Sequence, residues 1–194
     1  MKHIDLELKD GEAKYYPDFI EPKLASQIFD LLLSETPWQQ DDIKVFGKTY
    51  AQPRLTALYA NNEKPYSYSN ITMYPHKFSN TLISIKEQVE EISGNSFTTC
   101  LLNLYRHGQD SNGWHADDEK ELGINPVIAS VSFGAPRAFH LKHRKDPDEK
   151  RKIILENGSL LLMKGATQHF WLHQIPKTKK EVGQRINLTF RVIK

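Results

Sequence analysis

Cysteine is almost absent from this chain of 194 residues. The single cysteine, Cys100, cannot form a disulfide within the chain, and one cysteine is too few for a structural zinc cluster. This composition is typical of proteins that work in reducing compartments. We therefore expect the protein to be cytoplasmic.

Long hydrophobic runs are missing as well. No stretch of the sequence approaches the roughly 20 consecutive apolar residues that a membrane-spanning helix needs. The first residues include Asp5, Glu7 and Asp10, where a secretory signal peptide would have a basic start followed by an apolar core. These two absences lead us to expect neither a membrane partner nor a signal peptide.

Neither sign of charge is in excess. Lys and Arg number 26 and Asp and Glu number 24, which gives a formal net charge of +2. This balance excludes a chain-wide affinity for polyanions, so any nucleic-acid site must be a local patch. Glycine and proline are scattered, and no repeat divides the chain. We expect residues 1–194 to form one domain, and we expect a monomer.

Two segments have the hydrophobic spacing of amphipathic helices. The first, 21–34, has Pro22 in its first turn, and the second, 75–92, ends before Gly94. The apolar stripe expected on the first helix comprises Leu24, Ile28, Leu31 and Leu32.

Strand patterns dominate the rest of the chain, mostly in its second half. The expected strands are 43–46, 54–59, 97–105, 127–133, 138–143, 152–155, 159–163 and 185–193. Helices followed by many short strands favour an α+β fold, with a mainly β jelly-roll core (a double-stranded β-helix) flanked by N-terminal helices.

The last expected strand has two chemically different faces, because side chains alternate along a strand. Ile186, Leu188 and Phe190 form an apolar face. The other face carries two cations and two neutral hydrogen-bonding groups: Arg185, Asn187, Thr189 and Arg191. Guanidinium groups match carboxylates in charge and geometry, so this face suits a small dicarboxylate with one arginine at each end. A solvent-exposed edge strand is the alternative interpretation.

A candidate metal site begins at His115, because Asp117 follows two residues later and lies on the same side of an extended segment. His173 is the candidate third ligand, and His169, four residues earlier on the same face of a strand, competes with it. Two histidines and one carboxylate form the facial triad of non-haem Fe(II) oxygenases, which leaves coordination positions open for co-substrate and oxygen.

Asn103 and Tyr105 share one face of the strand that precedes His115, and the leucines between them and before them face the other way. Their polar groups are placed to add hydrogen bonds to the same anion, although a buried Tyr with a tethered hydroxyl is the commoner role.

Together these segments resemble the AlkB family of Fe(II)- and 2-oxoglutarate-dependent dealkylases over nearly the whole chain. The matching segments occur in the family's order: Asn103-x-Tyr105, WHADDE at 114–119, ASVSFG at 129–134, GSLLLM at 158–163 and RINLTFR at 185–191. The Trp-x-His pattern selects His173 over His169. The likeness is greatest to the branch that repairs duplex DNA.

The resemblance implies a set of cofactor ligands. It implies that His115, Asp117 and His173 bind Fe(II), with O2 as a co-substrate. The residues implied to bind 2-oxoglutarate are Asn103, Tyr105, Arg185, Asn187, Thr189 and Arg191, with Arg185 at the distal carboxylate and Arg191 at the other end. Residues 96–194 would form the catalytic jelly roll, and residues 1–95 an N-terminal extension with a nucleotide-recognition lid.

The resemblance also extends to substrate contacts. Tyr66, Tyr68 and Ser69 resemble lid residues that border a flipped base, although ordinary strand packing is an alternative for a Tyr-rich stretch. Phe46 resembles the wedge that duplex-repair members insert into the helix, and the alternative is a core residue of an edge hairpin. The remaining expected contacts are Arg54 near the lesion or its phosphates, Asp118 in preference to Glu119 at the exocyclic amine, and Lys179 and Lys180 at the unmodified strand.

The implied activity is oxidative demethylation of 1-methyladenine and 3-methylcytosine in double- and single-stranded DNA. Formaldehyde is released while 2-oxoglutarate and O2 become succinate and CO2, which makes the process a direct-reversal DNA repair. Two alternatives stay open from the sequence: the same oxygenase core acting on RNA or protein, and a catalytically inactive jelly roll that only binds nucleic acid.

Overall fold

The structure is a computed structural model that describes residues 1–45, 48–62, 66–68 and 71–193. The larger of its two main sheets has seven strands in the order β1-β2-β13-β10-β15-β8-β5, and every neighbouring pair is antiparallel. These strands are β1 (Ile4–Asp5), β2 (Glu12–Tyr16), β13 (Ser159–Lys164), β10 (Ile128–Gly134), β15 (Arg185–Arg191), β8 (Thr99–Tyr105) and β5 (Leu55–Ala60).

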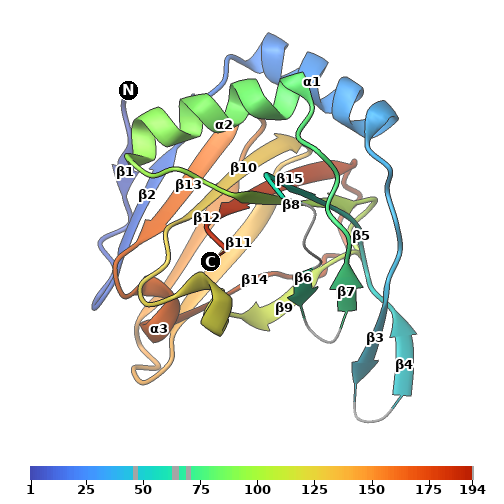
Figure 1. Cartoon of the computed structure of the whole chain (residues 1–194). Helices are drawn as coiled ribbons and strands as arrows, with labels where there is room; N and C mark the ends of the chain where they lie inside the picture. The colour runs from blue at the N-terminus through green and yellow to red at the C-terminus, as the bar shows by residue number, and fades with distance from the viewer. Residues whose placement is uncertain (46–47, 63–65, 69–70, 194) are drawn as a thin grey trace.

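The smaller sheet has four antiparallel strands in the order β12-β11-β14-β9. They are β12 (Lys150–Leu155), β11 (Arg137–His143), β14 (Trp171–Ile175) and β9 (Asn112–His115). Two separate hairpin pairs, β3 (Asp42–Val45) with β4 (Lys48–Ala51) and β6 (Tyr66–Tyr68) with β7 (Ile71–Met73), project beside the open end of the sheets (Figure 1). The two packed antiparallel sheets confirm the predicted jelly-roll fold class.

Two helices, α1 (Pro22–Glu35) and α2 (Asn80–Ser93), lie across the outer face of the larger sheet (Figure 1). Between these helices and the sheet lies one apolar core, in which Leu82, Ile85 and Val89 of α2 pack with Leu102 and Leu188. A second apolar cluster fills the space between the two sheets and includes Tyr105, Phe139 and Trp171. None of the helices among the described residues is long and apolar enough to span a membrane.

The first helix begins one residue later than expected, because the Glu21 side chain accepts hydrogen bonds from the backbone N–H groups of Lys23 and Leu24 and so caps it. Its expected apolar stripe is partly wrong. Leu24 and Leu31 are 48% and 37% exposed. The buried face is displaced by one position and uses Ala25 and Leu32, with Ile28 packed beside them.

The second helix begins at Asn80, so the expected start at residue 75 is wrong. Residues before it are extended, since His76 pairs with Tyr59 of β5 and exchanges backbone hydrogen bonds with that strand. The Ser79 hydroxyl then caps the helix by accepting from the Leu82 N–H. The helix ends at Gly94, whose φ of 69° is a left-handed conformation that glycine adopts easily.

The expected order of helices first and strands afterwards is also incomplete. β1 and β2 precede the first helix, and both belong to the larger sheet together with β5. The N-terminal 95 residues therefore supply three strands to the sheet that carries β15. A short helix, α3 (Thr167–Phe170), and a 3-10 turn, η1 (Lys120–Leu122), complete the described elements.

Candidate metal centre and dicarboxylate pocket

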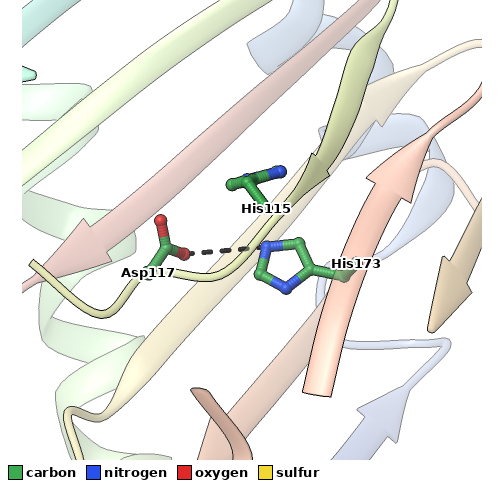
Figure 2. A group of neighbouring side chains, drawn as sticks. All are labelled: His115, Asp117 and His173. Atoms are coloured by element: carbon green, nitrogen blue, oxygen red, sulfur yellow. Dashed lines mark ion pairs between the residues drawn. The ribbon is translucent and has the colours of Figure 1, made fainter. Parts of the chain in front are cut away.

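The expected metal ligands come together between the two sheets. His115 ends β9, Asp117 follows it, and His173 lies in the middle of β14 directly opposite His115 in the strand register (Figure 2). One potential ligand atom from each of the three lies within 4.8 Å of the others. The two imidazole rings are packed edge to face with their centroids 4.3 Å apart, and His173 Nε2 is 3.8 Å from Asp117 Oδ2.

The hydrogen bonds of His115 fit metal binding. His115 Nδ1 lies 2.8 Å from the Gly113 carbonyl oxygen, which can only accept, so Nδ1 carries the proton. The lone pair is then on Nε2, where the Asn112 amide nitrogen lies 3.2 Å away. A hydrogen-bond acceptor on the ring nitrogen that does not bind the metal is the usual way in which proteins orient a histidine ligand. His173 is oriented instead by stacking on Phe139, with ring centroids 5.3 Å apart.

The protonation states also suit a cation. Burial lowers the pKa of His173 to about 3, and repulsion by His115 and Arg191 adds to this effect. Burial likewise lowers the pKa of His115. Burial by itself would raise the pKa of Asp117, but Arg191 and the two histidines outweigh it and lower that pKa. The site therefore offers two neutral imidazoles and one carboxylate, the set that Fe(II) takes in a facial triad.

Acid should destabilise the metal-free protein through His173. The unfolded chain binds a proton near pH 6.5, while the buried imidazole stays neutral down to about pH 3. Stability should thus fall as pH drops through this window, by about 1.4 kcal/mol per pH unit for this one group. Asp117, whose pKa is lowered from its ordinary value of 3.8, makes stability depend on pH only near and below pH 3.8.

Urea unfolding of the metal-free protein between pH 4.5 and 7 measures this effect, and the variant His173→Gln should show a shallower pH slope by about one proton. Equal slopes for the two proteins would contradict the neutral, buried state of His173.

A pocket for an anion adjoins the metal ligands. The cavity between the sheets is lined by the following residues: Arg54, Leu101, Asn103, Tyr105, Asn112, His115, Asp117, Ile128, Ser130, Phe139, Leu155, Met163, His173, Ile175, Arg185, Asn187, Thr189 and Arg191. All six residues predicted to bind 2-oxoglutarate are among them. They share this wall because Asn103 pairs with Asn187 and Tyr105 with Arg185 across β8 and β15.

Arg185 is the cation at one end of this pocket. It is 1% exposed, and its Nη2 donates to the Ser132 hydroxyl at 2.8 Å. Its Nε and Nη1 atoms are buried and make no hydrogen bond of ordinary geometry to a described residue. Burial lowers the pKa of Arg185 to about 10, while the nearby Tyr105 opposes this change. Two buried donors that need an acceptor fit one carboxylate of a dicarboxylate.

Arg191 is the cation at the other end. Its Nη2 donates to Asp117 Oδ1 at 2.7 Å, and both side chains are buried. Arg191 therefore connects the dicarboxylate wall to the metal ligands. Between the two arginines, Asn187 donates to the Ser130 hydroxyl at 2.7 Å and Thr189 donates to Asn187 at 3.0 Å. Ser130 and Ser132 escaped the site prediction, although both lie on the polar side of the alternating ASVSFG strand.

His169 is not placed as expected. It lies in α3 and not on a strand, is exposed, and packs edge to face against Phe170. It does not belong to the metal cluster found among the described residues. The expectation that the two histidines share a strand face is therefore wrong, whereas the choice of His173 over His169 agrees with this geometry.

The expected substrate contacts are only partly described. Phe46 and Ser69 lie outside the described residues, and Tyr66 and Tyr68 are described as backbone of β6 only. Lys179 and Lys180 are exposed on the connection between β14 and β15.

Arg54 is 5% exposed, lines the metal cavity, and donates from Nε to Asn103 at 2.8 Å and from Nη1 to the Ser111 carbonyl at 3.1 Å. This burial argues against the expected phosphate contact, while a contact with the lesion stays a prediction.

Asp118 does not line the cavity in this structure. Its half-exposed carboxylate pairs with Arg144 at 2.6 Å. Glu119 is more buried, and burial raises its pKa while the charge of Arg191 opposes that change. The structure therefore does not support the expected choice of Asp118 over Glu119 as the acidic contact to the base.

A jelly roll that holds two histidines, one carboxylate and a buried pair of arginines defines the class of non-haem iron oxygenases that use a dicarboxylate co-substrate. Residues 12–191 match the 2OG-Fe(II) oxygenase superfamily. The relatives include alpha-ketoglutarate-dependent dioxygenase alkB homolog 3 from Bos taurus, 44% identical over 91% of this chain and 64% of its own length. They also include DNA oxidative demethylase ALKBH2 from Arabidopsis thaliana, 37% identical over 99% of this chain and 69% of its own length.

The chain belongs to the AlkB family of the 2OG-Fe(II) oxygenase superfamily. It spans just under two thirds of the length of the alkB homolog 3 sequences that it matches. Among solved structures, "The structure of OsALKBH1" superposes with a TM-score of 0.66 at 16% identity, covering 97% of this chain and 100% of the other, which supports the fold.

Proposed function

We propose that this protein is a DNA repair enzyme that demethylates 1-methyladenine and 3-methylcytosine by oxidation. The observation that carries the proposal is the joint placement of His115, Asp117 and His173 beside two buried arginines in one cavity. Relatives named DNA oxidative demethylase support the choice of substrate.

In this proposal each group of side chains has a defined role. His115, Asp117 and His173 would hold Fe(II), and Arg185 and Arg191 would hold the two carboxylate ends of 2-oxoglutarate. With O2, the bound Fe(II) and 2-oxoglutarate would supply the oxidation, in which 2-oxoglutarate becomes succinate and CO2 and the N-methyl group is released as formaldehyde. The chain itself supplies binding, orientation and exclusion of water.

The protein residues keep this arrangement rigid. Arg191 holds the Asp117 carboxylate by a hydrogen bond of 2.7 Å, and the backbone carbonyl of Gly113 fixes the ring of His115. Arg54 holds the Asn103 amide from the cavity wall. Asp117 and His173 are buried, whereas His115, at the end of β9, is partly exposed. The site is therefore open beside β9, and a flipped base would enter there.

The direct test is aerobic incubation of the protein with Fe(II), 2-oxoglutarate and ascorbate, using matched single- and double-stranded oligonucleotides that contain 1-methyladenine. Mass spectrometry should show the loss of one CH2 from each repaired base. An RNA oligonucleotide of the same sequence serves as a further substrate. Faster loss from RNA than from either DNA would contradict the assignment to DNA, and succinate without any loss of mass would contradict a nucleic-acid substrate.

We also propose that Phe46 fills the gap that a flipped base leaves in duplex DNA. The variant Phe46→Ala should repair double-stranded substrate roughly ten-fold more slowly and leave repair of single strands within about two-fold, because only a duplex requires the stack to be opened. Tyr50→Ala provides the matched control, since Tyr50 is a 51% exposed aromatic residue on β4, four positions after Phe46 in the sequence. Equal loss on both substrates would speak against a wedge.

Two further features remain proposals. We propose that the protein acts as a monomer in the cytoplasm, and the single cysteine, which is free and buried, is consistent with a reducing compartment. We also propose that Lys179 and Lys180 contact phosphates of the unmodified strand, because both are exposed lysines on a connection near the site.

A further inference from the structure

The carboxylate ligand of the metal site sits on a segment that belongs to no strand or helix. β9 ends at His115 and the 3-10 turn begins at Lys120, so Asp117 lies in the intervening extended stretch. Its carboxylate is held by Arg191, as described above. Its backbone is held separately, because the Asp117 N–H donates to the side-chain oxygen Oε1 of Gln168 at 2.9 Å. Both residues are 2% exposed, so this bond does not compete with water.

Gln168 reaches Asp117 from a fixed position. It lies in α3, whose first residue, Thr167, is 1% exposed and bonded on several sides. The Thr167 hydroxyl accepts from the Glu12 N–H at 2.8 Å and lies within 2.6 Å of the Lys164 carbonyl oxygen. This short helix is therefore attached to β2 and to the end of β13, and its glutamine is presented from the framework of the larger sheet.

The side chain of Gln168 is oriented by its second polar group. Its Nε2 is directed at the Met163 sulfur at 3.5 Å, and Met163 lines the metal cavity. Sulfur accepts hydrogen bonds weakly, so the amide nitrogen gains little there. The energetic reason for a buried glutamine at this place is then the other end, where an oxygen must accept the Asp117 N–H.

Gln168 lies close in the sequence to one metal ligand, His173, and its side chain holds another, Asp117. Five residues after it comes His173, so one short segment carries a metal ligand and the group that holds the backbone of another. The backbone oxygen of Gln168 also accepts from Arg144 Nη2 at 3.3 Å, and the same nitrogen donates to Asp118 at 2.6 Å. The Gln168 side chain thus holds Asp117, and Arg144, which is bound to the Gln168 backbone, holds Asp118.

We propose that Gln168 is a positioning residue for the metal: it fixes the backbone of Asp117, and thereby the distance between the carboxylate and His173. The inference rests on the metal site of the proposed function. Groups that orient metal ligands typically change metal affinity by about 10–100-fold when removed. Gln168 should behave in this way although it never touches the metal or the substrate.

The test uses Co(II) as a probe, with no DNA and no 2-oxoglutarate present. Metal-free wild type and Gln168→Met are titrated with Co(II), and affinity and visible absorption are recorded. Methionine has a similar length but no oxygen to accept the Asp117 N–H, so we expect affinity to fall about ten-fold or more and the Co(II) bands to change. Gln168→Glu keeps an oxygen at the same reach and should recover most of the affinity.

Two controls make the outcome decisive. Gln174→Met changes a glutamine next to His173 on the other face of β14 and should bind Co(II) like wild type. Thermal unfolding of each metal-free variant identifies folded protein, and Gln168→Asn, which is too short to reach Asp117, replaces Gln168→Met if that variant does not fold. A folded variant without the acceptor that binds Co(II) as tightly as wild type would overturn the inference. Failure of wild type to bind Co(II) would instead overturn the proposed metal site.

Discussion

Replacing Asp117 with asparagine is expected to abolish turnover and to leave the fold intact. Asparagine has the same shape and its amide oxygen can still accept from Arg191 Nη2, which now lies 2.7 Å from Asp117 Oδ1. What disappears is the negative charge of one of three protein ligands. Because removal of a mere orienting group costs about 10–100-fold in metal affinity, loss of a ligand charge should weaken Fe(II) binding by more than about 100-fold.

Alanine at the same position should have a second effect. Asp117→Ala removes the carboxylate that pairs with the buried guanidinium of Arg191, and breaking a buried pair costs about 3–5 kcal/mol. Asparagine also leaves the buried charge of Arg191 uncompensated but keeps a hydrogen-bond acceptor for it, so both variants should unfold below the wild-type temperature, and the alanine variant should unfold earlier still. The two variants separate the role of Asp117 in catalysis from its role in stability.

Formaldehyde release, Mn(II) binding and thermal unfolding measure the three quantities. Asp118→Asn is the matched control, because its half-exposed pair with Arg144 is worth at most about 1 kcal/mol and should leave Mn(II) binding unchanged. Near-normal turnover of Asp117→Asn would refute the ligand assignment.

The sequence was most informative where its pattern repeats along a strand. Alternation along β15 predicted which of its side chains face the cavity, since Arg185 and Asn187 line it while Ile186 and Leu188 are buried in the other core. The same rule predicted that Asn103 and Tyr105 share a face of β8, and the structure pairs them with Asn187 and Arg185. Register between distant strands then followed from the fold, which brought His173 beside His115.

Features that depend on single tertiary contacts could not be predicted. Gln168 is separated from Asp117 by about a quarter of the chain, and no periodicity links the two residues. Arg54 resembles a surface cation in the sequence, yet its hydrogen bonds to Asn103 and Ser111 bury it. The spacing of apolar residues predicts too early a start for α2, because the pairing of His76 with β5 competes with helix formation and leaves no trace in that spacing.

Replacing Arg185 with methionine should remove 2-oxoglutarate binding without unfolding the protein. Loss of one partner from a buried, hydrogen-bonded charge pair costs about 2–5 kcal/mol of binding free energy, which corresponds to a KM for 2-oxoglutarate higher by roughly 30-fold to several thousand-fold. The metal-free protein should not lose stability, because methionine fills the space of the side chain and removes a buried cation that has no carboxylate within ion-pair distance among the described residues.

Arg137 provides a stringent comparison for this result. Both guanidinium groups lie against the Tyr105 ring, Arg185 at 5.2 Å and Arg137 at 5.7 Å from its centroid. Arg137, however, donates to the backbone carbonyls of His107, Asp110 and Pro176, so its hydrogen bonds are already made within the protein. Arg137→Met should therefore lower the melting temperature, whereas Arg185→Met should lose only the increase in melting temperature that 2-oxoglutarate and Mn(II) together produce.

The contrast follows from how each buried cation is satisfied. Carbonyl oxygens of the protein solvate Arg137 whether or not a ligand is present, so its removal leaves unpaired backbone groups. Among the described residues, the Nε and Nη1 donors of Arg185 have no hydrogen-bond acceptor, so an anion that enters the cavity is the partner that we expect for its charge. If Arg185→Met still showed the full ligand-induced shift, Arg185 would not be the group that holds one carboxylate of the ligand, and the assignment of the dicarboxylate to this end of the cavity would be wrong.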